Sequence, residues 1–313
     1  MTIAAHRAAL VHFVADPSVV GDEACEYFED GLLVVEKGRV VAAGTAEKLL
    51  PQFPDVPLSE YANSLIAPGF VNTHIHFPQT DVVAAYGADL LEWLEKHTFP
   101  AEECFADVGY AEEAAAFFLD SLMAAGTTTA LVFATVHRQS AEAFFAEAAS
   151  RNLRMLAGKV LMDRNAPPAL LDDADSAYTD SRALIEKWHG HKRLGYAVTP
   201  RFAPTSSSAQ LAAAGKLLRE CSDLHLHTHL SENRREIEWV KALFPDAAHY
   251  LDVYDRHGLL RRRSVFAHGV HLTDGEWRRL AETESSLAHC PMSNAFWAAA
   301  YLILVNQKNA ACA

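Results

Sequence analysis

Leu65-Ile66-Ala67-Pro68-Gly69-Phe70-Val71-Asn72-Thr73-His74-Ile75-His76 is an apolar run that ends in two histidines. Successive side chains of a β-strand point to opposite faces, so His74 and His76 project to the same side. Two neighbouring imidazoles at the end of an apolar strand form half of a metal site, and imidazole nitrogen suits zinc. The alternative is a pair of structural histidines near a turn. Further ligands at other strand ends decide between the two interpretations.

From Ile66 onward, apolar strand candidates alternate with amphipathic helical stretches, an order that predicts a parallel sheet with crossover helices. About seven such units favour an α/β fold with a (β/α)8 TIM-like barrel, incomplete at its C-terminal end. A doubly wound sheet is the alternative, but the sequence contains no Gly-rich phosphate loop. The predicted strands are Ile66–His74, Thr128–Phe133, Arg154–Leu161, Arg193–Thr199, His225–His229, Ser264–Ala267 and Ser286–Ala288. The predicted helices include Ala111–Ala125, Ala141–Ser150, Ala209–Cys221 and Asn233–Phe244.

The segment before this alternation has a different pattern. Ala8–Val14 is an apolar run, and residues 31–44 predict a β-hairpin that turns at Glu36-Lys37-Gly38. We therefore expect three regions: a small N-terminal β subdomain over residues 1–65, the barrel over 66–294 and an atypical tail over 295–313.

Composition narrows the class of partner. Forty Asp and Glu against 27 Lys and Arg give a formal net charge of -13, and no long basic run offsets it. Nucleic acid and anionic membrane are therefore excluded as main partners, and a small, weakly charged substrate is favoured. Five scattered cysteines indicate a reducing compartment, and the sequence shows neither a signal peptide nor a membrane-length apolar stretch. We expect a cytoplasmic protein.

Histidines recur at the ends of the later strands, where a barrel places its active site. Of His225, His227 and His229, the last lies nearest the barrel mouth and is the expected ligand, whereas the other two pack or orient. His268 follows the next strand and directly precedes a glycine. Glu232 comes three residues after His229, as a proton shuttle requires. It could also be an N-cap or first-turn glutamate of the helix predicted over residues 233–244, and both roles can hold together.

The type of metal site can also be narrowed. No lysine ends the fourth strand, so a carbamate bridge between two metals is not expected and one metal is favoured. The zinc deaminase signature H-x-E…P-C-x-x-C is absent, which excludes that separate fold.

The first-strand stretch resembles that of the amidohydrolase superfamily, and other stretches resemble the guanine deaminase family within it. These stretches are residues 90–102, 199–205, 227–233 and 288–294. The resemblance implies zinc-dependent deamination of guanine to xanthine and ammonia. It implies one zinc ion bound by His74, His76 and His229, a purine held by Gln79, Arg201 and Phe202, proton transfer by Glu232, and oxygen stabilisation by His268.

The tail departs from this pattern. The family's last metal-site residue is an aspartate, which would fall beyond the end of this chain, and residues 295–313 contain no Asp, Glu or His. We therefore expect a chain truncated or frameshifted after Asn294, with an eighth strand either missing or improvised from Tyr301–Val305. The expected function is a guanine deaminase impaired by this loss, and a homodimer if the chain folds. The alternatives are an inactive remnant or another deaminase of the superfamily.

Overall fold

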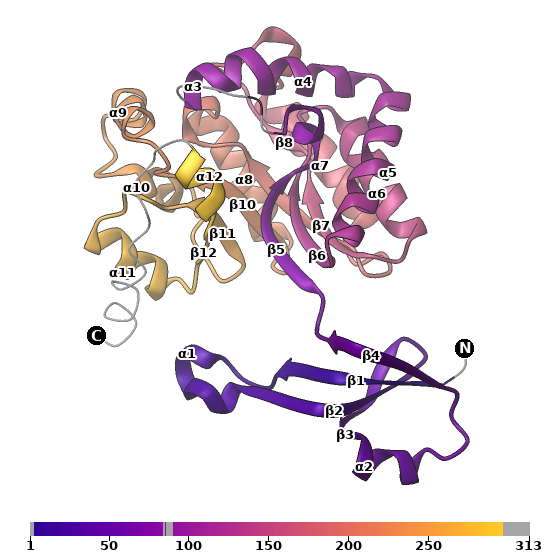
Figure 1. Cartoon of the computed structure of the whole chain (residues 1–313). Helices are drawn as coiled ribbons and strands as arrows, with labels where there is room; N and C mark the ends of the chain where they lie inside the picture. Colours follow the sequence, from indigo (N-terminus) through magenta and orange to yellow (C-terminus); the bar gives the residue numbers. More distant parts are fainter. Residues whose placement is uncertain (1–2, 84, 86–89, 297–313) are drawn as a thin grey trace. The chain divides into compact units, whose positions relative to one another are not determined.

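The computed structural model describes residues 3–83, 85 and 90–296, and it contains two compact units. The first unit comprises Met1–Gly69 and the second Phe70–Ala313, and each is described by itself (Figure 1). The domain boundary expected between residues 65 and 66 lies four residues before this division. The three expected regions remain a prediction. The tail beyond residue 296, including the strand expected at Tyr301–Val305, lies outside the described residues.

The first unit is a four-stranded sheet with strand order β3-β2-β1-β4. Its hairpin is confirmed, because β2 and β3 pair antiparallel around Lys37 and Gly38, which both have positive φ. The apolar run at Ala8–Val14 lies mostly in β1, which pairs with β2 and, in parallel, with β4. The strands are β1 (Ala4–Phe13), β2 (Cys25–Glu36), β3 (Arg39–Thr45) and β4 (Leu58–Ile66).

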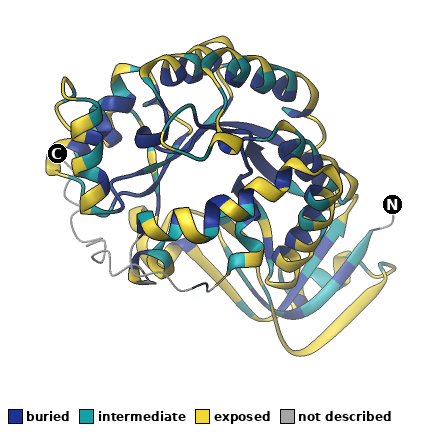
Figure 2. Ribbon diagram, turned by 90° about the horizontal axis from the view of Figure 1, so that it is seen from above, coloured by how far each residue is buried: buried dark blue, intermediate teal, exposed yellow. Residues whose placement is uncertain are grey.

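The second unit is the predicted parallel barrel. Its strands pair in the order β12-β11-β10-β9-β7-β6-β5, and every pairing between them is parallel. Figure 2 shows buried strands inside a ring of helices whose outer faces are exposed. The strands are β5 (Phe70–His76), β6 (Thr127–Phe133), β7 (Arg154–Gly158), β8 (Val160–Leu161), β9 (Gly195–Pro200), β10 (His225–Leu230), β11 (Ser264–His268) and β12 (Ser286–Ala288).

Helices follow the strands as the alternation predicts, and their apolar faces form one large core with the sheet. Alanine and phenylalanine dominate the buried faces of α5 and α6, which pack against each other and contact β6 and β7, respectively. The main helices are α5 (Val108–Ala124), α6 (Arg138–Ser150), α7 (Ala174–Trp188), α8 (Ser208–Glu220), α9 (Arg234–Leu243), α10 (Tyr250–Arg256), α11 (Asp274–Glu282) and α12 (Pro291–Phe296).

Two predicted strands differ from the observed ones by more than a shift of one or two residues at an end, whereas the strand predicted over residues 193–199 only shifts, to 195–200. Ile66 ends β4 of the first unit, and the barrel strand begins only at Phe70, because Pro68 lacks the N–H that a continuous ladder needs. The strand predicted over Arg154–Leu161 is divided into β7 and β8 at Lys159. Lys159 is buried and pairs with Asp172, so this break in the strand accompanies a buried ion pair.

Within the described residues, no helix is both long enough and apolar enough to cross a membrane.

Candidate active site

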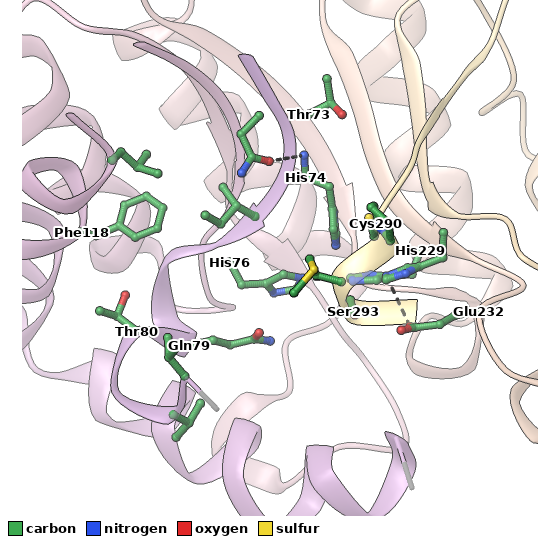
Figure 3. A pocket seen from close by; sticks show the side chains of 18 of the residues that line it. Thr73, His74, His76, Gln79, Thr80, Phe118, His229, Glu232, Cys290 and Ser293 are labelled. Atoms are coloured by element: carbon green, nitrogen blue, oxygen red, sulfur yellow. Dashed lines mark hydrogen bonds and ion pairs between the residues drawn. The ribbon is translucent and has the colours of Figure 1, made fainter. Parts of the chain in front are cut away.

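Three histidines from two strands meet at the carboxyl end of the barrel. His74 and His76 lie on β5 and His229 lies on β10, and one ring nitrogen of each lies within 4.8 Å of the other two. The Nε2 atoms of His76 and His229 are 3.1 Å apart, close to the separation of two ligands on one zinc ion. Figure 3 shows these three side chains converging from opposite sides of the pocket. The structure thus brings together the three ligands expected from the sequence.

Hydrogen bonds orient the imidazoles. The Nδ1 atom of His229 lies 2.8 Å from the carbonyl oxygen of Arg201, so Nδ1 carries the proton and Nε2 keeps its lone pair for a metal. The Nδ1 atom of His74 lies 2.8 Å from Nε2 of His227, a fully buried histidine one strand-repeat before His229. His227 therefore orients the imidazole of His74, and orienting is one of the two roles that its position in the sequence left open.

Burial keeps the three imidazoles neutral. It lowers the pKa of His74, His76 and His229 well below the ordinary 6.5, and mutual repulsion among the histidines lowers it further. Neutral imidazole is the form that binds metal. The Nε2 atom of His76 faces His229, and its Nδ1 atom is buried without a hydrogen-bond partner among the described residues. Three neutral nitrogens with converging lone pairs fit a zinc ion.

An aromatic ring packs beneath this cluster. The parallel register of β5 and β6 places Phe133 beside His76, and the two rings stack with centroids 4.5 Å apart. The centroid of Phe133 also lies 5.4 Å from that of His74 and 4.7 Å from that of His229. Phe133 is fully buried, so it limits the space into which the three imidazoles could turn.

A carboxylate and a fourth histidine lie beside the triad. The Oε2 atom of Glu232 is 3.4 Å from the Nε2 atom of His268, and both side chains are buried. The Nδ1 atom of His268 bonds the Oδ1 atom of Asn294 at 2.9 Å, which turns Nε2 toward the glutamate. His268 and Ser231, the residue before Glu232, both have positive φ. Such strained backbone in non-glycine residues is concentrated at functional sites.

The helix-capping interpretation of Glu232 is wrong. Asn233 caps α9 and forms a capping box with Glu236, whereas Glu232 precedes the cap. Burial raises the pKa of Glu232 to about 8, so its carboxyl group holds a proton at neutral pH in the metal-free protein. Glu236 accepts hydrogen bonds from the backbone N–H groups of Glu232 and Asn233 and from the Tyr250 hydroxyl, which anchors the loop that carries Glu232.

A cavity of about 1240 Å³ opens onto these groups. It is lined by His74, His76, His229, Glu232 and His268 and by the three residues expected to hold a substrate, Gln79, Arg201 and Phe202. Gln79 follows β5 and reaches toward the cavity interior, where Figure 3 shows its amide near His76. Arg201 and Phe202 directly follow β9, and both side chains are almost completely buried. All eight predicted site residues therefore line one cavity.

A second group of side chains is also close enough to hold a metal. It consists of His74, His268 and Cys290, which follows β12. The two groups share His74, and each residue offers one ligand atom, so two separate ions cannot both be bound with a full set of three ligands. Burial raises the pKa of the Cys290 thiol to about 12, and its Sγ donates to the carbonyl oxygen of Ala288 at 3.3 Å. A protonated thiol is a poor metal ligand, which favours the all-histidine group.

Several residues of the site were not singled out in the sequence. Phe133 is the last residue of its strand, a position that could have indicated it. Asn294 lies in the family-like stretch 288–294, but nothing there indicated its contact with His268, and Tyr254 had no signal in the sequence at all, because both act through side-chain contacts made across the fold. The Tyr254 hydroxyl accepts from the N–H of Ala203 and donates to the carbonyl oxygen of His229.

Comparison with known proteins places this site in a family. A model described as the Amidohydrolase family matches residues 65–300. A guanine deaminase of Escherichia coli (strain K12) is 55% identical over 274 residues, which cover 87% of this chain and 62% of that protein. The chain therefore spans less than two thirds of this relative's length.

Solved structures agree with the sequence relatives. The structure of E. coli guanine deaminase superposes with a TM-score of 0.96 and 49% identity, covering 98% of this chain and 72% of that one. A guanine deaminase of C. acetobutylicum, solved with guanine bound in its active site, superposes with a TM-score of 0.90 and 27% identity. The second alignment covers 98% of this chain and 72% of that chain.

Proposed function

The chain belongs to the amidohydrolase family, and we propose that it catalyses the zinc-dependent hydrolytic deamination of guanine to xanthine and ammonia. The observation that carries the proposal is the meeting of three neutral histidines, a buried glutamic acid and an arginine in one cavity. The similarity to guanine deaminases over most of the chain supports guanine as the substrate.

In this proposal His74, His76 and His229 hold one zinc ion. When bound, zinc lowers the pKa of a water molecule, which supplies a nucleophile for attack on C2 of the purine near neutral pH. The chain's own part is to keep the three imidazoles neutral and convergent. The carbonyl oxygen of Arg201 does this for His229, and His227 does it for His74.

Gln79, Arg201 and Phe202 hold the purine. Guanidinium and amide N–H groups match the carbonyl oxygen at C6 and the ring nitrogens of guanine. Phe202 presents an aromatic side chain suited to a flat ring, and Trp239 packs edge-on against it with ring centroids 6.3 Å apart. Arg201 and Gln79 bind the edge of the purine that carries the C6 oxygen. The 2-amino group on the other edge therefore points toward the three histidines.

Glu232 and His268 manage protons and charge. A glutamic acid with a raised pKa can protonate the purine ring nitrogen as the water oxygen bonds to C2, and it takes the proton that the water loses. The same carboxyl group then protonates the departing amine, the C2–N bond breaks, and ammonia leaves. The resulting carboxylate accepts the remaining proton of the C2 hydroxyl, which becomes the carbonyl oxygen of xanthine, and the glutamic acid is restored. His268, held by Asn294, stabilises the developing negative charge on the oxygen.

The proposal is tested by measuring bound metal and xanthine formation on the same purified chain. We expect about one zinc per chain, and turnover of guanine that Glu232→Gln abolishes while the zinc content stays unchanged. Glu238→Gln, which changes an exposed glutamate on α9, is the matched control and should keep full activity.

Metal exchange gives a second readout. The chain loaded with Co²⁺ should show the absorption of nitrogen ligands and no thiolate-to-cobalt band, and Cys290→Ser should leave that spectrum unchanged. A metal-free chain with no turnover would support the inactive-remnant alternative. Turnover of another aminopurine in preference to guanine would support a different deaminase of the superfamily. A homodimer and a cytoplasmic location stay predictions, which sedimentation and cell fractionation would test.

A further inference from the structure

Arg201 is the most completely enclosed charge that borders the cavity. Its side chain is 2% exposed, and its Nη1 atom donates to both carboxylate oxygens of Glu102, at 2.7 and 2.9 Å. Glu102 itself is fully buried. Among the described residues no other group accepts a hydrogen bond from this guanidinium. Its remaining N–H donors are therefore left for the cavity that Arg201 lines.

The element that carries Glu102 is built around this contact. Glu102 lies in α4 (Phe99–Glu103), which directly follows a π-helical turn at Leu94–Thr98. Such turns are rare and occur frequently at functional sites. The ring of Phe99, from the first position of α4, lies under the guanidinium with its centroid 5.4 Å from Cζ. A carboxylate at one edge and a ring at one face together fix the guanidinium plane.

The backbone of Arg201 is tied to the metal site. Its carbonyl oxygen accepts from Nδ1 of His229 at 2.8 Å and from Oγ1 of Thr228 at 3.2 Å. Arg201 therefore connects the proposed purine contact to a proposed zinc ligand. The guanidinium can shift without moving this carbonyl oxygen. An experiment can therefore separate the contribution of the side chain to purine binding from that of the carbonyl oxygen to the orientation of His229.

We propose that Glu102 is a positioning residue that holds Arg201 for the carbonyl oxygen at purine C6, and thereby makes the site selective for 6-oxopurines. This inference rests on the proposed function. A guanidinium whose plane is fixed presents donors only, so a 6-oxo group is bound and a 6-amino group places donor against donor. A site built to hydrogen-bond one substrate group rejects analogues that lack it, because its own buried donors are left unpaired.

The test compares two substrates that share the reacting 2-amino group. Guanine carries the oxygen at C6, whereas 2-aminopurine lacks it. In Glu102→Gln we expect kcat/KM for guanine to fall about 100-fold, mainly through KM, as is usual for a misplaced binding group. We expect kcat/KM for 2-aminopurine to change less than about threefold and zinc content to stay the same. Glu102→Asp should restore part of the loss, and Glu103→Gln, an exposed neighbour on α4, should behave as wild type.

A binding measurement separates this inference from the proposed function. On the Glu232→Gln background, 2-aminopurine fluorescence reports its own affinity and, by displacement, that of hypoxanthine, which carries the 6-oxo group. Adding Glu102→Gln should weaken hypoxanthine and leave 2-aminopurine unchanged. Failure of both purines to bind or react in the wild type would refute the proposed function itself.

Equal losses for both ligands, or a parallel loss of zinc, would overturn the inference and leave Glu102 with a merely structural role. No change in either ligand would overturn it as well. If Glu102→Gln does not fold, the double variant Glu102→Gln with Arg201→Gln removes both buried charges together, which buried pairs tolerate better. That variant should lose the preference for 6-oxopurines over 2-aminopurine while keeping its zinc.

Discussion

At the scale of single residues, the histidines of this chain differ in function although they share one strand face. His225, His227 and His229 occupy alternate positions of β10, yet only His229 belongs to a group of side chains that could hold a metal ion. His227 contacts His74 instead, across the barrel interior. The order along the strand decides this division, because each step of two residues moves a side chain further toward the barrel mouth.

The contact between His227 and His74 gives the first prediction. Changing His227 to Ala should lower zinc affinity about 10- to 100-fold, because outer partners of this kind fix the orientation of a ligand imidazole. Competition with a chromogenic chelator measures the affinity directly. His225→Ala is the matched control, since His225 is not part of either metal-binding group and should retain wild-type affinity. Equal affinity in all three proteins would contradict the proposed role of His227.

Glu232 gives the second prediction, for the metal-free protein. Burial raises the pKa of Glu232 in the folded protein to about 8, above its ordinary value of 4.5. Between pH 4.5 and pH 8, Glu232 is therefore protonated in the folded chain and ionised in the unfolded chain. Glu232 therefore contributes stability below about pH 4.5, and that contribution is lost as the pH rises through 8. Each pH unit of this interval is worth at most about 1.4 kcal/mol for one proton.

Glu232→Gln cannot ionise, so its advantage in unfolding free energy over wild type should grow from about pH 5 to pH 8 and then level off. Urea unfolding in the presence of a chelator at several pH values measures this difference. The exposed Glu238→Gln variant should follow the wild-type curve throughout. Parallel curves for wild type and Glu232→Gln would show that Glu232 ionises normally in the folded protein.

At the scale of helices and strands, regular segments were predictable and tertiary contacts were not. β6, β10, β11 and β12 agree with their predicted ranges to within one residue at each end, because short apolar runs bounded by polar residues define them. The strand predicted from Ile66 failed, since one apolar run supplies the end of β4 and, after a proline, the start of β5. Periodicity within a segment cannot show that its two halves belong to different sheets.

The same distinction holds for the site. Strand-end histidines carry a local pattern, so His74, His76, His229 and His268 could be placed at the barrel mouth from the sequence. Glu102 could not, because its partner Arg201 is 99 residues away and nothing near Glu102 in the sequence requires a buried charge. Contacts of this kind depend on which elements the fold brings together, and only the structure shows that.

Tyr254, on α10, gives a prediction at this scale. Its hydroxyl accepts from the N–H of Ala203, after β9, and donates to the carbonyl oxygen of His229 on β10. Tyr254→Phe leaves a buried N–H unpaired and should lower the free energy of unfolding by roughly 1 to 3 kcal/mol. Thermal and urea unfolding measure the loss. Tyr178→Phe, which removes a hydroxyl bonded to the partly exposed Glu220, is the control and should cost clearly less.

At the scale of the barrel unit, the strand order has two ends. Within the described residues β5 pairs only with β6, and β12 pairs only with β11. Phe70 and Val71 on β5 are 69% and 65% exposed, and Met292 after β12 is 84% exposed. These side chains also line the cavity, so apolar surface that is exposed within the described part of the chain borders the candidate site on one side. An uncovered strand edge with apolar side chains promotes association between chains.

The last prediction follows from that edge. Val71→Lys places a charge on the open side of β5, where lysine opposes edge-to-edge pairing, and should reduce association of this 313-residue chain at micromolar concentration. Light scattering over a dilution series measures it, and zinc content should stay unchanged because Val71 is not among the metal-binding groups. Val19→Lys, at a valine of the first unit that is also exposed, adds the same charge elsewhere and should have little effect. If both variants reduce association equally, net charge is the cause, and the exposed edge of β5 has no special part in it.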